Sequence, residues 1–89
     1  MLDCLSEMRT KGIIYEKSKA FSLNIISLSN DMRERGEYIM SRQILKSGTS
    51  IGANYCEALG AESLQDFIHK VAISLKEANE TYYWLDLIY

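Results

Sequence analysis

The sequence lacks proline and is poor in residues that bind metals, with one histidine and two cysteines. Without proline, stretches of 3.6-residue periodicity can continue as unbroken helices, which argues against a sheet built from many turns. Cys4 and Cys56 lie far apart and resemble neither a CxxC metal pair nor a disulfide framework, so we expect no disulfide. Asp66-x-x-His69 is a single lookalike of the Glu-x-x-His motif, which di-iron bundles carry on two helices, so we expect no metal and no cofactor.

Long apolar runs are absent as well. No uninterrupted apolar stretch reaches the roughly 18 residues that a membrane span requires. The first residues, MLDCLSEMRTK, lack the apolar core of a secretion signal. We therefore expect neither membrane insertion nor secretion, and we expect a cytoplasmic location.

A surplus of positive charge is also missing. The formal net charge is −2, which argues against strong non-specific binding to nucleic acid, because phosphate neutralisation requires an excess of Lys and Arg. The distribution is uneven, since residues 1–46 hold eight of the ten basic side chains and residues 47–89 hold two. Four basic residues near the expected first turn form either a solvated helix end or a set of phosphate contacts. They are Arg33, Arg35, Arg42 and Lys46.

Hydrophobic periodicity predicts one helical domain over residues 13–89, preceded by an N-terminal arm over residues 1–12. In the first helix, expected over about 14–35, apolar residues follow steps of three and four, and Gly36 gives the backbone freedom that ends it. Its apolar face consists of Ile14, Phe21, Ile25, Leu28 and Met32, with Ser18 in the same stripe.

The second helix, expected over about 38–60, carries a ridge of small residues. They recur every four positions and therefore line one side, where another helix can approach closely. Glycine within a helix costs up to about 1 kcal/mol relative to alanine, and close packing is one compensating gain. The alternative for KSGTSIGAN, a phosphate-binding loop, needs a preceding strand and a GxxxxGK[ST] pattern, and neither is present. The ridge consists of Gly48, Gly52, Cys56 and Gly60.

The third helix, expected over about 64–89, has the most regular pattern. Ser63 is a good N-cap, and Asp66 places a carboxylate near the positive end of the helix dipole. An unbroken stripe in steps of four and three predicts a helix-packing seam. Further apolar residues widen this surface, so a fourth helix or a neighbouring subunit is needed to cover it. The seam is Leu64, Ile68, Val71, Leu75, Ala78, Tyr82, Leu85 and Tyr89, widened by Phe67, Tyr83, Trp84, Leu87 and Ile88.

Three amphipathic helices with short connections predict an all-α fold, an antiparallel up-down helical bundle. The stretches EKSKAF and QILKSGTSIGANYCEALGAESLQDFIHKVAISLKEANETYYWLDLI closely resemble the bacterial four-helix bundle family of 23S rRNA intervening-sequence proteins. The resemblance covers residues 14–89. It implies a four-helix fold, of which this sequence has three helices and lacks the fourth, and a homo-oligomer that is typically a pentamer.

The resemblance also implies a kind of partner. Some members of the family are encoded inside intervening sequences of ribosomal RNA genes, and a related branch serves as the accessory protein of diversity-generating retroelements. Both contexts imply RNA or a ribonucleoprotein. We therefore expect a non-enzymatic oligomeric scaffold associated with RNA, without a small-molecule substrate. The alternative is an adaptor that binds a partner helix in an uncovered groove.

Polar residues beside the apolar seams match the family pattern. Such residues either pair across helices, which sets register and partner choice, or form ordinary solvated faces. We expect Glu57 to pair with Lys76 or with a neighbouring group. The full polar set is Asn54, Glu57, Lys76, Glu77 and Glu80.

Aromatic residues gather at the end of the third helix. Aromatic side chains on a helix belong either to the core or to an interface, where Trp and Tyr dominate binding energy. A stacking platform for nucleobases would need basic residues nearby, and this end of the chain is acidic. The cluster is Tyr82, Tyr83, Trp84 and Tyr89.

Overall fold

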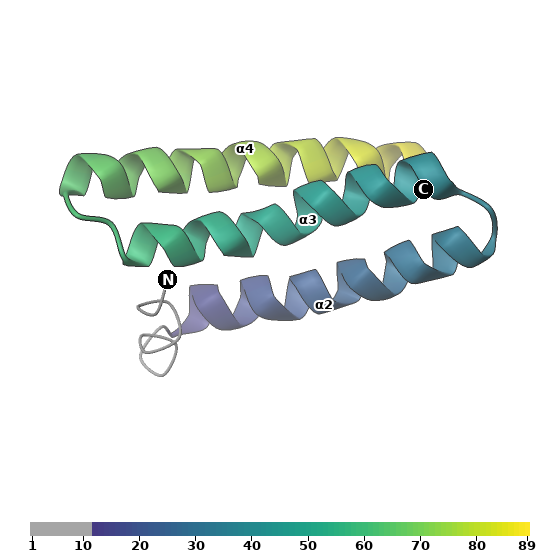
Figure 1. Ribbon diagram of the computed structural model, residues 1–89, viewed down its shortest axis with the longest axis horizontal. Coiled ribbons are helices and arrows are strands. Elements are labelled where there is room, and N and C mark those ends of the chain that lie inside the picture. The colour runs from purple at the N-terminus through teal and green to yellow at the C-terminus, as the bar shows by residue number, and fades with distance from the viewer. Residues whose placement is uncertain (1–11) are drawn as a thin grey trace.

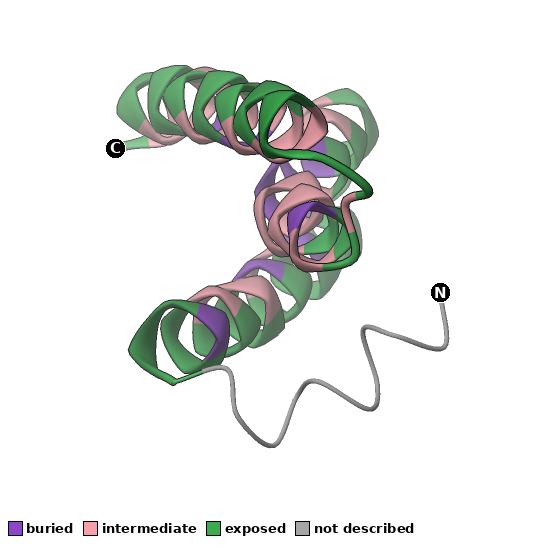
Figure 2. Ribbon diagram, turned by 90° about the vertical axis from the view of Figure 1, so that its left-hand side faces the viewer, coloured by how far each residue is buried: buried purple, intermediate pink, exposed green. Residues whose placement is uncertain are grey.

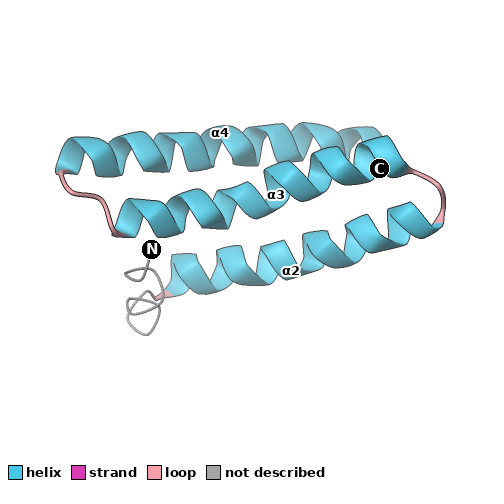
Figure 3. Ribbon diagram, in the orientation of Figure 1, coloured by secondary structure: helices cyan, strands magenta, loops and turns pink. Residues whose placement is uncertain are grey.

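The computed structural model describes residues 12–89, which contain three helices and, within that range, no strand (Figure 3). The helices are α2 (Ile13–Glu34), α3 (Tyr38–Leu59) and α4 (Leu64–Ile88). Each end differs from its expected position by at most one residue. Successive helices run in opposite directions, joined by short links (Figure 1). The arm expected over residues 1–12 lies outside the described residues except for Gly12.

The link between α2 and α3 is a tight turn centred on Gly36. This glycine has a φ of 87°, a left-handed conformation that side chains with a Cβ rarely adopt. The Glu37 amide donates to the Met32 carbonyl at 2.9 Å, and the Gly36 amide donates to the Arg33 carbonyl at 3.0 Å. These two bonds form a Schellman motif, so the helix ends where its last carbonyls find partners.

The start of α4 is fixed by a side-chain cap. The Ser63 hydroxyl accepts a hydrogen bond from the Asp66 amide at 3.0 Å, which satisfies one of the donors that a helix start leaves open. By contrast, Glu37 precedes α3 without a side-chain cap. The first turn of α3 therefore keeps amide groups that no capping side chain occupies.

The three helices form an arc in which α3 lies between the other two (Figure 2). Both α2 and α4 pack extensively on α3 and make little contact with each other. The core lies toward the end where α2 turns into α3 and where α4 ends. Its buried apolar centre is Ile25, Met32 and Ile44, surrounded by Phe21, Leu28, Met40, Leu45, Trp84, Leu85 and Ile88.

Glycines bring α2 and α3 close together. A Cβ added at Gly48 would lie 2.8 Å from Cγ2 of Ile25, a distance at which the isoleucine must move. A Cβ added at Gly52 would lie 3.2 Å from its nearest neighbour, the Ser18 hydroxyl oxygen. Position 18 of the α2 stripe faces Gly52 at close range. A small side chain such as serine fits there.

Hydroxyl groups between α3 and α4 are buried about as deeply as the apolar core. The hydroxyls of Ser47 and Thr81 share a hydrogen bond of 3.0 Å, and both side chains are 1% exposed. The Ser74 hydroxyl donates to the Ile51 carbonyl across the interface at 2.7 Å. Small hydroxyl side chains allow close approach while their polar atoms stay paired, which avoids the cost of an unpaired buried group.

Candidate functional site

One side of α4, next to the side that faces α3, exposes large apolar residues. Leu75 is 62% exposed and Tyr82 is 73% exposed, whereas Ser74 and Thr81, one position earlier in each case, are buried. The hydroxyls therefore face α3, and the leucine and tyrosine lie about 100° further around the helix, where α3 does not cover them. We call the exposed residues of the predicted seam the outer stripe, and they are Leu64, Ile68, Leu75, Tyr82 and Tyr89.

This orientation differs from the simplest interpretation of the seam. Its other residues, Val71, Ala78 and Leu85, are half-buried, so α3 covers one edge of the seam and leaves the outer stripe uncovered. The physical reason is that hydroxyls seven residues apart, at Ser74 and Thr81, pack closer to α3 than leucine or tyrosine would allow. That seven-residue spacing beside the apolar stripe is the signal in the sequence that points to this buried face.

An apolar groove on the inner side of the arc adjoins the outer stripe. It has a volume of about 320 Å³ and receives side chains from all three helices. Tyr82 belongs to both surfaces, so groove and stripe form one continuous apolar area. Large exposed apolar patches of this kind mark interaction sites. The groove is lined by Ser18, Phe21, Ile51, Ala78, Thr81, Tyr82 and Leu85.

The aromatic cluster at the end of α4 is divided between core and surface. Trp84 packs against the buried core, and its indole N–H donates to a carboxylate oxygen of Glu80 at 3.2 Å. Tyr83 contacts Trp84 edge to face, with ring centroids 5.3 Å apart. Tyr82, Tyr83 and Tyr89 are exposed. The tryptophan is therefore committed to the fold, and the tyrosines are available for contacts.

The small-residue ridge is also divided along its length. Gly48 and Gly52 face α2 at close range. Cys56 is half-buried and disulfide-bonded, so the expectation of no disulfide from the cysteine spacing is wrong. It lines a cavity of about 220 Å³ together with Gly52 and Tyr15. Gly60 is exposed and follows the last residue of α3. Close approach of α2 and α3 thus rests on the first two glycines, because Gly60 lies beyond the helix.

The polar residue opposite Glu57 is Lys70, not Lys76. The Lys70 ammonium lies 3.4 Å from a Glu57 carboxylate oxygen and joins α3 to α4. Lys76 is exposed and lies six residues further along α4, which turns it about 240° around the helix from Lys70. The reason is the short link after α3, because it places the start of α4 beside the end of α3.

The remaining polar candidates bond within their own helices. The Asn54 side-chain amide donates to the Ser50 carbonyl at 2.8 Å, four residues earlier. The carboxylate of Glu80 accepts from Trp84, and the backbone carbonyl of Glu77 accepts from the Thr81 hydroxyl at 2.7 Å. The polar set is therefore one interhelical ion pair with local hydrogen bonds beside it, rather than a single network.

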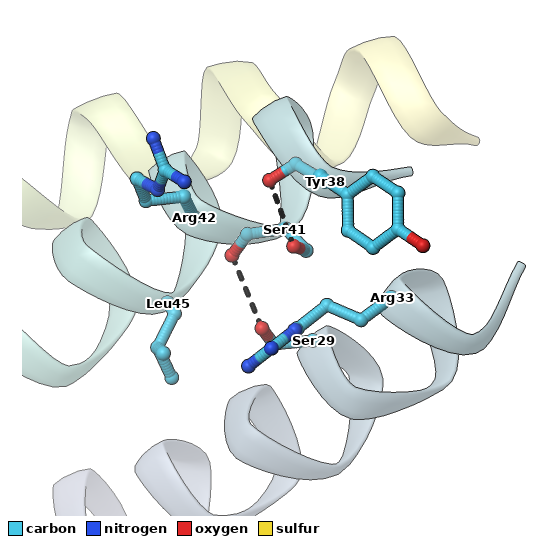
Figure 4. A pocket seen from close by; sticks show the side chains of 6 residues that line it. All are labelled: Ser29, Arg33, Tyr38, Ser41, Arg42 and Leu45. Carbon is cyan, nitrogen blue, oxygen red and sulfur yellow. Dashed lines mark hydrogen bonds between the residues drawn. The ribbon is translucent and has the colours of Figure 1, made fainter. Parts of the chain in front are cut away.

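The four basic residues near the first turn do not act as one group. Arg33 and Arg42 line the same cavity between α2 and α3 (Figure 4). Arg35 instead pairs with Asp31 on its own helix at 3.1 Å. Lys46 is exposed and does not line that cavity.

Other kinds of site find no support in the described part of the chain. Residues 12–89 contain no group of three His, Cys, Asp or Glu side chains that could hold a metal ion. Within the same residues, no helix combines the length and apolar character of a membrane span. The glycine-containing stretch 46–54 lies inside α3, so its amides belong to helical hydrogen bonds and do not form a phosphate loop.

A comparison with protein families matches residues 10–89 to the family described as 23S rRNA-intervening sequence protein. The chain belongs to this family. It is also similar to the crystal structure of a protein with unknown function from the S23 ribosomal protein family of Bacteroides thetaiotaomicron, at 52% identity and a TM-score of 0.83. That similarity covers 85% of this chain and 71% of the other. A comparison with curated proteins found no match.

The family resemblance carried by the sequence is thereby confirmed. The solved relative supports the helical fold at an identity high enough for family membership as well as architecture. Its function is described as unknown, and neither description names an enzymatic activity.

Proposed function

We propose that this member of the 23S rRNA-intervening sequence protein family is a non-enzymatic helical-bundle scaffold that assembles into a homo-oligomer. The observation that carries the proposal is the outer stripe, where leucine, isoleucine and tyrosine are exposed on a helix that buries hydroxyls. Removing such an apolar face from water is favourable, by about 25 cal/mol for each Å² of apolar surface buried. Association with other helices is the way to bury it.

The groove and the stripe suggest how assembly proceeds. In this proposal α2, α3 and α4 are three members of an antiparallel up-down bundle, and a further helix takes the fourth position over the apolar groove. The outer stripe then contacts a neighbouring subunit. Five subunits are the expected number, on the family resemblance alone.

Light scattering coupled to size exclusion tests the assembly. The variant Leu75→Glu places a charge in the outer stripe, and we expect its mass to fall to that of a monomer, because a buried unpaired carboxylate is costly. Helix content by circular dichroism should stay unchanged, since Leu75 is exposed within the single chain.

Leu23→Glu is the matched control for this variant. Leu23 is 59% exposed, much as Leu75 is, but it lies on α2 outside both the groove and the stripe. The control should retain the mass of the unmodified protein. A monomeric unmodified protein across the whole concentration range, or an equal loss of mass in both variants, would contradict the proposal.

We also propose RNA or a ribonucleoprotein as the partner of the assembly, in the cytoplasm. The family description and the cavity that Arg33 and Arg42 line support this partner. Because phosphate contacts release counterions, the affinity for single-stranded RNA should fall steeply as salt is added. Binding that is absent at low salt would refute this part and leave the assembly proposal standing.

A second candidate function is an adaptor that takes an amphipathic helix of another protein into the groove. The continuous apolar lining from three helices favours it, because a helix in a groove is recognised through apolar anchors at helical spacing. Such binding should persist at high salt, which separates it from RNA binding. A substitution in the groove, such as Ala78→Glu, should abolish it.

A further inference from the structure

A second cavity, unrelated to the apolar groove, lies between α2 and α3 beside the Gly36 turn. We call it the turn pocket, and it has a volume of about 260 Å³. It shares no lining residue with the groove. Leu45 of the pocket and Ile51 of the groove lie six residues apart, which is about 240° around α3. The turn pocket is lined by Ser29, Arg33, Tyr38, Ser41, Arg42 and Leu45.

Two buried serines form the floor of the turn pocket. The Ser29 hydroxyl donates to the Ser41 carbonyl at 3.1 Å, and the Ser41 hydroxyl donates to the Tyr38 carbonyl at 3.0 Å. Both serines are buried, and these bonds hold α2 and α3 at a fixed spacing. Because the two hydroxyl hydrogens are already used, donors for a ligand come from the side chains around the floor.

Those side chains are donors from both helices. Figure 4 shows Arg33 of α2 extending toward Ser29, with Arg42 of α3 beyond the Ser29–Ser41 hydrogen bond and Tyr38 to one side. Neither arginine forms an ion pair with another described residue, unlike Arg35. Arg42 is exposed, so its guanidinium can turn toward a ligand at small cost.

The charges around the turn pocket favour an anion. No carboxylate lines it. Among the acidic residues around it, Glu34 borders Arg33 and Tyr38 in an adjoining hollow, Glu37 precedes α3, and Asp31 pairs with Arg35. The first turn of α3, which lacks a side-chain cap, adds the positive end of a helix dipole. Two guanidinium groups without a described ion pair and the start of α3 therefore border one small volume.

We propose that the turn pocket binds a phosphate group. Its volume lies below the range of about 300–1,000 Å³ that is usual for drug-sized ligands, which favours a small anion over a cofactor. A phosphate offers several acceptor oxygens in different directions, so it can accept from Arg33 together with Arg42 once the exposed Arg42 side chain turns toward it. The phosphate comes either as the free ion or as part of an RNA backbone, and the RNA source rests on the proposed function.

Titration with inorganic phosphate at constant ionic strength tests the pocket, with the amide resonances of Tyr38 and Arg42 followed by NMR. We expect saturable shifts in the unmodified protein. Arg33→Gln and Arg42→Gln should each weaken binding about tenfold or more, as expected for a hydrogen bond to a charged group. Arg35→Gln is the matched control, because it removes the same charge from the same turn outside the pocket, and it should change affinity less than about twofold.

A second titration with a single-stranded oligouridylate distinguishes the two phosphate sources. If the pocket variants weaken RNA binding and Arg35→Gln does not, the pocket holds a backbone phosphate. If free phosphate binds in the pocket and RNA does not, the pocket assignment stands and the RNA proposal fails. Absence of saturation with both ligands overturns the assignment, and so does equal weakening by Arg33→Gln and Arg35→Gln.

Discussion

The two sides of α3 hold their neighbours by different means. Toward α2, glycine at position 48 leaves room for Ile25, and the contact depends on shape. Toward α4, the hydroxyls of Ser47 and Thr81 meet, and the contact depends on hydrogen bonding. One interface is therefore sensitive to added volume, and the other is sensitive to the loss of a polar partner.

This difference explains how a small chain can leave so much apolar surface outside. Small and hydroxyl side chains let the helices approach closely without burying the outer stripe of α4. The residues of that stripe then remain available for contacts. Along α4, the hydroxyls of Ser74 and Thr81 thus contact α3, and the outer stripe beside them stays exposed.

The largest effect is expected where shape decides. Gly48→Leu adds a branched side chain where even a Cβ would lie 2.8 Å from Ile25. We expect a loss of roughly 3 kcal/mol or more in the free energy of unfolding, because overpacking forces side chains and backbone to move. Chemical denaturation followed by circular dichroism measures it. A midpoint equal to that of the unmodified protein would show that the helices do not approach closely at this position.

Gly52→Ala is the matched control on the same interface. The added Cβ would lie 3.2 Å from the Ser18 hydroxyl oxygen, which can rotate away. Alanine also improves helix propensity by up to about 1 kcal/mol. The free energy of unfolding should therefore stay within about 1 kcal/mol of the original value.

An intermediate effect is expected where hydrogen bonding decides. Thr81→Val keeps the volume but leaves Ser47 without the hydroxyl 3.0 Å away, and we expect a loss of about 1–3 kcal/mol in unfolding free energy. The double variant Ser47→Ala with Thr81→Val removes both partners. It should be more stable than the sum of the two single losses predicts. Strict additivity would mean that the two hydroxyls do not stabilise each other.

The smallest effect is expected at the surface ion pair between α3 and α4. The side chain of Glu57 is 63% exposed and that of Lys70 is 28% exposed, at 3.4 Å. Glu57→Gln should lower the unfolding free energy by less than about 1 kcal/mol, and added salt should reduce the difference. Glu62→Gln, at an exposed loop residue, provides the same charge change as a control. A decrease in unfolding free energy above about 2 kcal/mol would contradict this prediction, because an exposed ion pair screened by water contributes less than that.

The helices could be predicted from the sequence because their signals are local. Apolar spacing marks each helix, Gly36 ends the first, and Ser63 caps the third. Which side of α4 meets α3 could not be predicted in this way. Apolar periodicity favours burial of the largest side chains, whereas Ser74 and Thr81 pack closer because they are small and paired.

The candidate sites were harder to predict from the sequence, because they too depend on how the helices pack. Four basic residues are near one another in the sequence, but helix geometry directs Arg33 and Arg42 to one cavity and Arg35 to Asp31. Likewise, the partner of Glu57 depends on how the link after α3 aligns the two helices. Such pairings are set by the packed arrangement, which no single helix pattern specifies.

The position of α3 between α2 and α4 has a consequence for how the chain folds. Each packed pair is a hairpin of neighbouring helices closed over a short link, and the two hairpins share α3. Contacts between neighbours in sequence lower the entropy of loop closure and favour rapid folding. Either hairpin can therefore begin the process. Because α3 is held from both sides, its amide hydrogens should be the last to exchange with water.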